Sequence, residues 1–84
     1  MSILDRIRAH GGEVIRREYR LTLRRGRLND AALRWLGARW QNVCREAWPE
    51  FDDWDERAAI REYEGGMPRA EAEAAAYRDV MGRT

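Results

Sequence analysis

A helical apolar stripe over residues 30 to 47 is the strongest structural signal in the sequence. Its members recur at spacings of three and four residues, and they are Leu33, Leu36, Trp40, Val43 and Ala47. This spacing places them on one face of an α-helix, which then forms part of the core. Asn29 supplies an N-cap, and the Trp48-Pro49 dipeptide ends the helix because the residue before a proline is pushed out of the helical region. We expect one core helix from about residue 30 to residue 47.

The residues before this helix predict a short helix and a β-hairpin. Ser2 is an N-cap for a helix over residues 2 to 9, with Ile3, Leu4 and Ile7 on one face, and the helix ends at Gly11-Gly12. Val14-Ile15 and the alternating Tyr19, Leu21 and Leu23 are typical of two half-buried strands. We expect the turn between them at Arg16-Arg17-Glu18.

The residues after Pro49 predict two more helices. The first runs from Asp53 to Glu64, buries Trp54, Ala58 and either Ile60 or Tyr63, and ends at Gly65-Gly66. The second starts near Pro68 and is alanine-rich, with an expected inward stripe of Ala70, Ala74, Tyr77 and Met81. The expected order is α-β-β-α-α-α, an α+β fold. With 84 residues we expect a single domain over residues 1–84, made of an αββα part over residues 2–47 and an acidic helical hairpin over residues 50–84.

Composition excludes several classes of protein. The single cysteine, Cys44, and the single histidine, His10, rule out an intrachain disulfide framework and a Cys/His metal cluster. They also leave no standard pair of nucleophile and base, so we expect no enzyme and no cofactor. Cys44 is expected to be a buried hydrophobe, and His10 to end the first helix. The polar N-terminus and the short apolar runs predict neither a signal peptide nor a membrane span, hence a cytoplasmic location.

Charge is distributed unevenly along the chain. All sixteen basic residues are arginines, and 11 of them stand against 4 acids in residues 1 to 45, a net charge of +7. Residues 46 to 84 hold 5 arginines and 11 acids, a net charge of −6, so the total is +1. The two halves either neutralise each other or present one basic and one acidic face to partners, and the sequence leaves both alternatives open.

The hairpin and its exit loop carry candidate phosphate-binding side chains, with Tyr19 available for stacking. They are Arg16, Arg17, Arg20, Arg24, Arg25 and Arg27. Such an arginine cluster predicts nucleic-acid binding that weakens as salt rises. The alternative is that these arginines pair with the acidic half of the chain.

Candidate protein-binding residues come from two places. Trp35 stands five positions before Trp40, about 140° around the helix, so it lies at the edge of the buried stripe or outside it, beside Arg39. The acidic segment after residue 46 supplies four more candidates, Glu50, Asp52, Asp53 and Asp55, among the aromatic residues Trp48, Phe51 and Trp54. The alternative for this segment is a solvated helix start, where acids favour the helix dipole and the aromatics belong to the core.

Residues 2–47 resemble the N-terminal docking domains of the TubC type, which occur on nonribosomal peptide and polyketide assembly lines and in phage and mobile-element proteins. The features that match are the first helix, Gly11-Gly12, Val14-Ile15, the Tyr19/Leu21/Leu23 strand and the helix entry at residues 28–33. The resemblance implies docking onto a protein partner, including a homodimer. Residues 56–73 are similar to a tail seen on phage and plasmid proteins. A small phage-type protein also suggests an inhibitor, with anti-CRISPR proteins as one class.

The sequence therefore predicts a non-enzymatic, phage- or mobile-element-type protein that binds and blocks or bridges a protein or ribonucleoprotein partner. The alternative is a small nucleic-acid-binding accessory protein that uses the arginine-rich hairpin. Four Trp, three Tyr and one Phe are many large side chains for so small a core, so we also expect a homodimer that covers the surface around Trp35.

Overall fold

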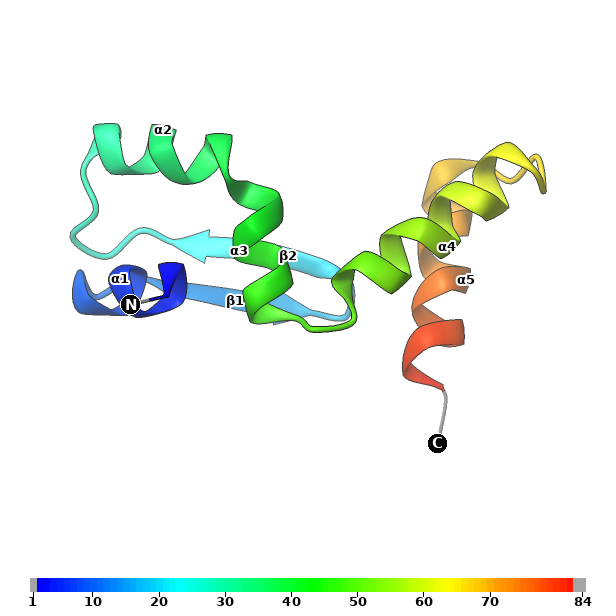
Figure 1. The fold of residues 1–84 in the computed structure, drawn as a ribbon, viewed down its shortest axis with the longest axis horizontal. Coiled ribbons are helices and arrows are strands. Elements are labelled where there is room, and N and C mark those ends of the chain that lie inside the picture. Colours follow the sequence, from blue (N-terminus) through cyan, green and yellow to red (C-terminus); the bar gives the residue numbers. More distant parts are fainter. Residues whose placement is uncertain (1, 83–84) are drawn as a thin grey trace. The chain divides into compact units, whose positions relative to one another are not determined.

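The computed structural model describes residues 2–82, which form one β-hairpin and five helices (Figure 1). The order is α1 (Ile3–Ala9), β1 (Glu13–Arg17), β2 (Arg20–Arg24), α2 (Asp30–Ala38), α3 (Trp40–Ala47), α4 (Phe51–Tyr63) and α5 (Arg69–Met81). The predicted α+β order of helix, hairpin and helices is confirmed, but the described chain has five helices, not four. Contacts group the elements into an N-terminal unit, which ends at Trp48, and a C-terminal unit, which begins at Pro49.

Helix α1 forms as its sequence predicts. The Ser2 hydroxyl accepts a hydrogen bond from the Asp5 N–H at 3.1 Å, which satisfies one of the free donors at the helix start. The chain leaves the helix through Gly11, whose φ of +72° is easily adopted only by glycine. The helix then lies against β1 and α3 through its apolar face.

The hairpin is antiparallel, and its turn differs from the expected one. Val14 is paired with Leu23 and Arg17 with Arg20, so the turn consists of Glu18 and Tyr19. Glu18 adopts a φ of +57°, the left-handed conformation that two-residue hairpin turns need and that Asn or Gly usually supplies. The prediction of a turn at Arg16-Arg17-Glu18 is therefore wrong, and Tyr19 lies in the turn instead of the second strand.

The expected single helix over residues 30 to 47 is broken at Arg39. This residue has φ −119° and ψ 23°, and its N–H bonds to the Leu36 carbonyl oxygen at 3.0 Å in a tight last turn. Gly37, just before the break, weakens the helix. Leu36 from α2 and Val43 from α3 belong to one core cluster, together with Ile7 of α1 and Leu28.

The predicted core stripe is confirmed in two of its five members. Leu36 and Val43 are buried, Leu33 and Trp40 are half-buried against the cluster, and Ala47 is half-buried. Trp48 and Cys44 are also buried. Trp48 adopts an extended backbone before Pro49, as expected, and this ends α3.

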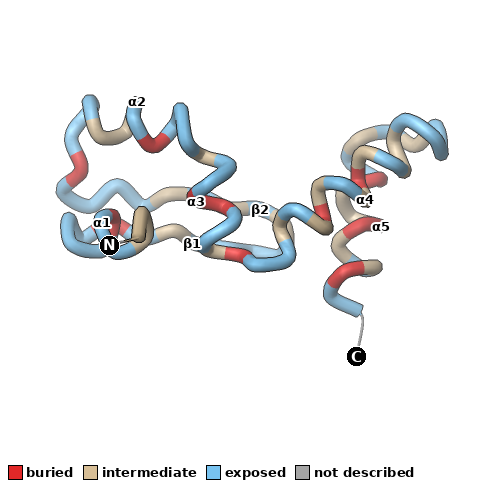
Figure 2. The backbone as a smooth tube through the Cα atoms, in the orientation of Figure 1, coloured by how far each residue is buried: buried red, intermediate tan, exposed pale blue. Residues whose placement is uncertain are grey.

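Helices α4 and α5 pack against each other to form the C-terminal unit (Figures 1 and 2). The buried side chains of α4 are Trp54 and Ala58, as predicted, and the Trp54 indole N–H donates to the Glu73 carbonyl oxygen at 3.0 Å. Ile60 and Tyr63 are 47% and 80% exposed, so the expectation that one of them points inward is wrong.

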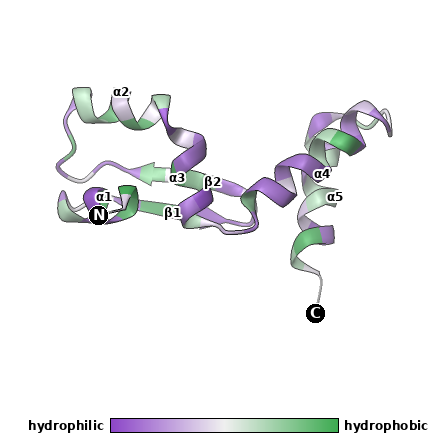
Figure 3. Cartoon of the chain, viewed as in Figure 1, coloured by the Kyte–Doolittle hydropathy of each residue, from purple (hydrophilic) through white to green (hydrophobic). Residues whose placement is uncertain are grey.

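The inward face of α5 also differs from the expected one. Its buried residues are Ala72, Ala75, Ala76 and Val80, whereas Ala70 and Met81 are exposed. Alanines occur all around this helix, so their spacing does not distinguish one face from another. Figure 3 shows hydrophilic and hydrophobic segments following one another along both α4 and α5.

Within the described residues no helix combines the length and the apolar character that crossing a membrane requires.

Candidate functional site

The N-terminal unit carries an open apolar groove of about 310 Å³ between α1 and α2. Its apolar lining consists of Ile7, Leu28, Ala32 and Leu36. Arg6 and His10 from the α1 side and Trp35 from α2 complete the lining. We call this surface the Trp35 groove. On each helix the lining residues are spaced by three or four positions, so each helix presents one face to the groove.

The loop that follows the hairpin is fixed against the end of α1, and this places Leu28 in the groove. The Arg27 N–H donates to the His10 carbonyl oxygen at 2.7 Å, and its guanidinium donates to the Ala9 carbonyl oxygen at 3.1 Å. Gly26 lies so close to Gly11 that a Cβ there would stand 2.4 Å from the Gly11 carbonyl carbon. The groove therefore depends on a close contact between two backbone segments.

Trp35 is 38% exposed, outside the buried stripe, as its helical spacing predicts. The Arg39 guanidinium carbon lies 4.2 Å from the centre of the indole ring, a cation–π contact between residues one helical turn apart. The structure therefore brings together Trp35 and Arg39, the two candidate protein-binding residues of the predicted core helix. This contact restrains a large aromatic side chain at the edge of an apolar groove.

His10 and Arg6 line the groove, although the sequence did not indicate either of them as a binding residue. The Nδ1 of His10 lies 2.9 Å from the Arg6 carbonyl oxygen, and because a carbonyl only accepts, Nδ1 carries the hydrogen of this bond. The Arg6 side chain also lines the groove. The signal in the sequence for this placement was spacing, because Arg6 and His10 are four residues apart and therefore lie on the same side of the helix.

The four acidic candidates lie in the C-terminal unit, at the start of α4. Glu50 occupies the N-cap position and Asp52 is exposed, while Asp53 is 3.1 Å from the Arg57 guanidinium and Asp55 is 3.1 Å from that of Arg69. Asp53 and Asp55 are thus engaged by arginines of their own unit. Trp35 and Arg39 belong to the N-terminal unit, so neither unit holds all six predicted protein-binding residues.

The aromatic residues of the acidic segment contribute to the cores. Trp48 is buried in the N-terminal unit and Trp54 in the C-terminal unit. Phe51 is half-buried, with its ring centre 5.7 Å from that of Trp54. These aromatics are placed as the core alternative predicted.

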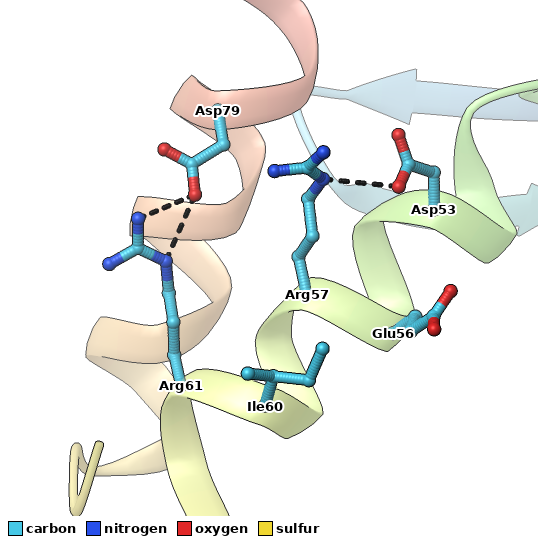
Figure 4. Close-up of a pocket in the computed structure, with 6 residues that line it drawn as sticks. All are labelled: Asp53, Glu56, Arg57, Ile60, Arg61 and Asp79. Atoms are coloured by element: carbon cyan, nitrogen blue, oxygen red, sulfur yellow. Dashed lines mark hydrogen bonds and ion pairs between the residues drawn. The ribbon is translucent and has the colours of Figure 1, made fainter. Parts of the chain in front are cut away.

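A charged pocket of about 480 Å³ lies on the C-terminal unit (Figure 4). Arg57 points to Asp53 at 3.1 Å, and Arg61 of α4 reaches Asp79 of α5 with its Nε at 3.0 Å. Glu56 and Ile60 complete the lining. Both arginines are thus engaged by carboxylates within the pocket: the Arg57–Asp53 pair lies within α4, and the Arg61–Asp79 pair joins α4 to α5.

Arg69 connects the two helices of the same unit. Its guanidinium donates to Asp55 at 3.1 Å, to Glu62 at 3.2 Å and to Glu73 at 3.2 Å. Burial acts to lower the pKa of Arg69, but the hydrogen bonds to these three carboxylates outweigh it and raise the pKa above its ordinary value.

Four of the six hairpin arginines have partners within the N-terminal unit. Arg16 donates to the Glu18 carbonyl oxygen at 2.8 Å and lies 5.3 Å from the ring centre of Trp48. Arg24 pairs with Glu13 at 3.1 Å and Arg25 with Asp30 at 2.9 Å, and Arg27 holds the loop as described above. These arginines therefore contribute to the structure of the unit itself.

Arg17 and Arg20 have a different environment. They are partners across the last pair of the hairpin, and with Ile15 and Thr22 they line a shallow hollow of about 220 Å³. Neither guanidinium forms an ion pair with any residue from 2 to 82. All six predicted nucleic-acid contacts are exposed, and within residues 2–82 these two are the ones that are not used in a contact of the unit itself.

Metal-binding geometry is missing from the described residues, where no three His, Cys, Asp or Glu side chains are grouped so that they could hold an ion.

Comparison with protein-family models, with curated protein sequences and with solved structures gave no match. The resemblance of residues 2–47 to docking domains therefore stays a prediction. Function is inferred below from the geometry and chemistry of the chain itself.

Proposed function

We propose that this chain is a non-enzymatic binding protein that blocks or bridges a macromolecular partner, and that the Trp35 groove is the surface by which it binds. The observation that carries the proposal is Trp35 itself, held 38% exposed by Arg39 beside an apolar groove. Tryptophan and arginine are the side chains most enriched at binding hot spots, because they combine a large apolar area with polar contacts.

The lining of the groove supports binding over catalysis. His10 is its one residue that commonly serves as a general base, and its Nδ1 is engaged with a backbone carbonyl oxygen. A lone imidazole without a nucleophile or an orienting carboxylate supports no named reaction. A partner that covers an exposed apolar surface removes it from water, and this lowers the free energy of the complex.

The phage or mobile-element origin and the anti-CRISPR type of inhibition are finer proposals that rest on sequence resemblance. In such an inhibitor exposed acids near the start of α4, such as Glu50, would compete with nucleic acid for arginines of the target.

Co-purification with a matched pair of variants tests the binding proposal. Trp35→Ala is expected to lose a partner that the wild-type chain retains from a host lysate, whereas Tyr63→Ala, which removes the 80% exposed aromatic of α4, retains it. Circular dichroism must show that both variants stay folded. A wild-type chain recovered alone at low salt, or full capture by Trp35→Ala, contradicts the proposal.

Nucleic-acid binding by the hairpin is the second candidate, because Arg17 and Arg20 face solvent on one face of it. The double variant Arg17→Ala/Arg20→Ala is expected to abolish a gel shift with DNA or RNA at low salt. The charge-matched control Arg34→Ala/Arg78→Ala removes two exposed arginines elsewhere and should preserve the shift. Arg24, Arg25 and Arg27 are poorer targets, since their loss also breaks contacts of the fold. No retarded band with the wild-type chain would exclude this function.

A further inference from the structure

We propose that the occupant of the Trp35 groove is an acidic amphipathic helix of another protein, with a large apolar side chain that enters the groove. This inference rests on the proposed function and names the chemistry of the partner.

The shape of the groove favours a helix. Its two walls are the helices α1 and α2, and each contributes side chains at helical spacing, Arg6, Ile7 and His10 on one wall and Ala32, Trp35 and Leu36 on the other. Amphipathic helices bind such grooves through anchors with the same spacing. A volume of about 310 Å³ holds about ten waters, and one or two large apolar side chains would displace them from an apolar lining.

The charges around the groove favour an acidic occupant. Arg6 lines it, and Arg39 covers one face of Trp35. Among residues 2–82 neither guanidinium has a carboxylate partner. Carboxylates on the bound helix would therefore find one arginine without a carboxylate partner on the α1 wall, Arg6, and a second beside Trp35, Arg39.

Three carboxylates of the N-terminal unit, those of Asp5, Asp30 and Glu46, are engaged elsewhere. Asp5 pairs with Arg8 at 3.8 Å and Asp30 with Arg25 at 2.9 Å. Glu46 accepts a hydrogen bond from the Ile3 N–H at 3.1 Å. The acids closest in sequence to the groove helices thus have partners, and a partner protein has to supply the missing negative charge.

A second copy of the chain is a poorer occupant. A two-fold contact through this groove would place the same surface on both subunits, so Arg6 and Arg39 of one copy would approach those of the other. Like charges brought together at an interface weaken it. The homodimer around Trp35 that the aromatic content predicts is therefore the competing outcome of the test below.

Three labelled helical peptides of 17 residues test the proposal by fluorescence polarisation on the full chain. The first carries Leu, Phe and Leu at helical spacing on one face and Glu on the other. The second replaces each Glu with Lys, and the third replaces the three anchors with Ala. We expect the acidic peptide to bind at least about tenfold more tightly than either control.

Variants of the chain then locate the site. Trp35→Ala is expected to weaken the acidic peptide at least about tenfold, and Tyr63→Ala to leave its affinity unchanged. Arg6→Glu places a carboxylate on one wall and should shift the preference toward the lysine peptide, a change that loss of folding does not produce.

Three results overturn the inference: equal or tighter binding of the lysine peptide, no binding of the acidic peptide to the folded wild-type chain, or a dimer that Trp35→Ala dissociates. If Trp35→Ala loses a lysate partner while no peptide binds, the proposed function stands and the acidic helix is wrong. If Trp35→Ala also keeps its lysate partner, the proposed function fails as well.

Discussion

Cys44 shows at the scale of one residue how burial controls chemistry. The thiol is 3% exposed, and desolvation raises its pKa, although the charge of Arg45 acts in the opposite direction. A raised pKa in the folded state means that the stabilising effect of the neutral thiol is complete below its unfolded pKa. This effect is lost as pH rises through the folded value.

We expect slow alkylation of Cys44 for this reason. At pH 8 the native chain should react with iodoacetamide at least about a hundredfold more slowly than the chain in urea, because reaction requires opening of the unit. Mass spectrometry of timed samples measures both rates. Equal rates with and without urea would show that the thiol is accessible.

Gly26 and Gly37 form a matched pair for testing the loop against α1. At Gly26 the backbone φ is +59° and a Cβ would meet backbone atoms of Gly11 and Gly12 within 2.6 Å, whereas at Gly37 a Cβ would meet nothing within 4 Å. Gly26→Ala should lower the free energy of unfolding by about 2–4 kcal/mol. Gly37→Ala should raise it by about 0.5–1 kcal/mol. Urea titration measures both, and an unchanged midpoint for Gly26→Ala contradicts the described loop.

At the scale of elements, we expect Arg69 to stabilise the contact between α4 and α5, because its three carboxylate partners come from both helices. Asp55 and Glu62 belong to α4 and Glu73 to α5. Its side chain is 40% exposed, so solvent screens each pair, and the network as a whole is worth about 1–2 kcal/mol. Arg69→Met should lower the unfolding midpoint accordingly.

Arg78→Met is the control for Arg69, since it removes an exposed arginine of the same helix that forms no ion pair within residues 2–82. Thermal unfolding followed by circular dichroism compares the two. If both variants lose the same stability, the three carboxylates do not stabilise the contact between α4 and α5.

The charge distribution acts at the scale of the whole molecule. The formal net charge is only +1 and the pI is about 8.0, although the two halves of the sequence carry +7 and −6. Near pH 8 the chain has little net charge, so its copies repel one another weakly. The positive half of one copy can attract the negative half of another, so we expect association at low ionic strength. Light scattering should give an average mass above 9.9 kDa in about 20 mM salt, and a mass near this value in about 0.5 M salt. A mass that does not change with salt contradicts this prediction.

The ends of several elements could be predicted from the sequence, because serine at an N-cap, glycine after a helix and proline each have a well-defined effect on the local backbone. Ser2, Gly11 and Pro49 end or start elements at the expected positions, and the spacing of Leu36 and Val43 identifies the core face. The half-exposed Trp35 also follows from spacing alone. Local conformation and helical periodicity are properties of a few neighbouring residues, so the sequence states them directly.

Tertiary packing decided the rest. The break of the helix at Arg39 does not follow from the spacing of the apolar stripe, and the inward face of α5 is selected among many alanines by the helix it packs on. The hydrogen bond from Arg27 to the Ala9 carbonyl oxygen joins residues 18 positions apart, and the groove formed by α1 and α2 also joins segments that are distant in the sequence. The sequence by itself therefore determined which segments are helix and strand and that Trp35 stands apart from the core. Which arginines remain open to a partner was decided only when distant segments met, because an ion pair depends on distance in space and not on distance along the chain.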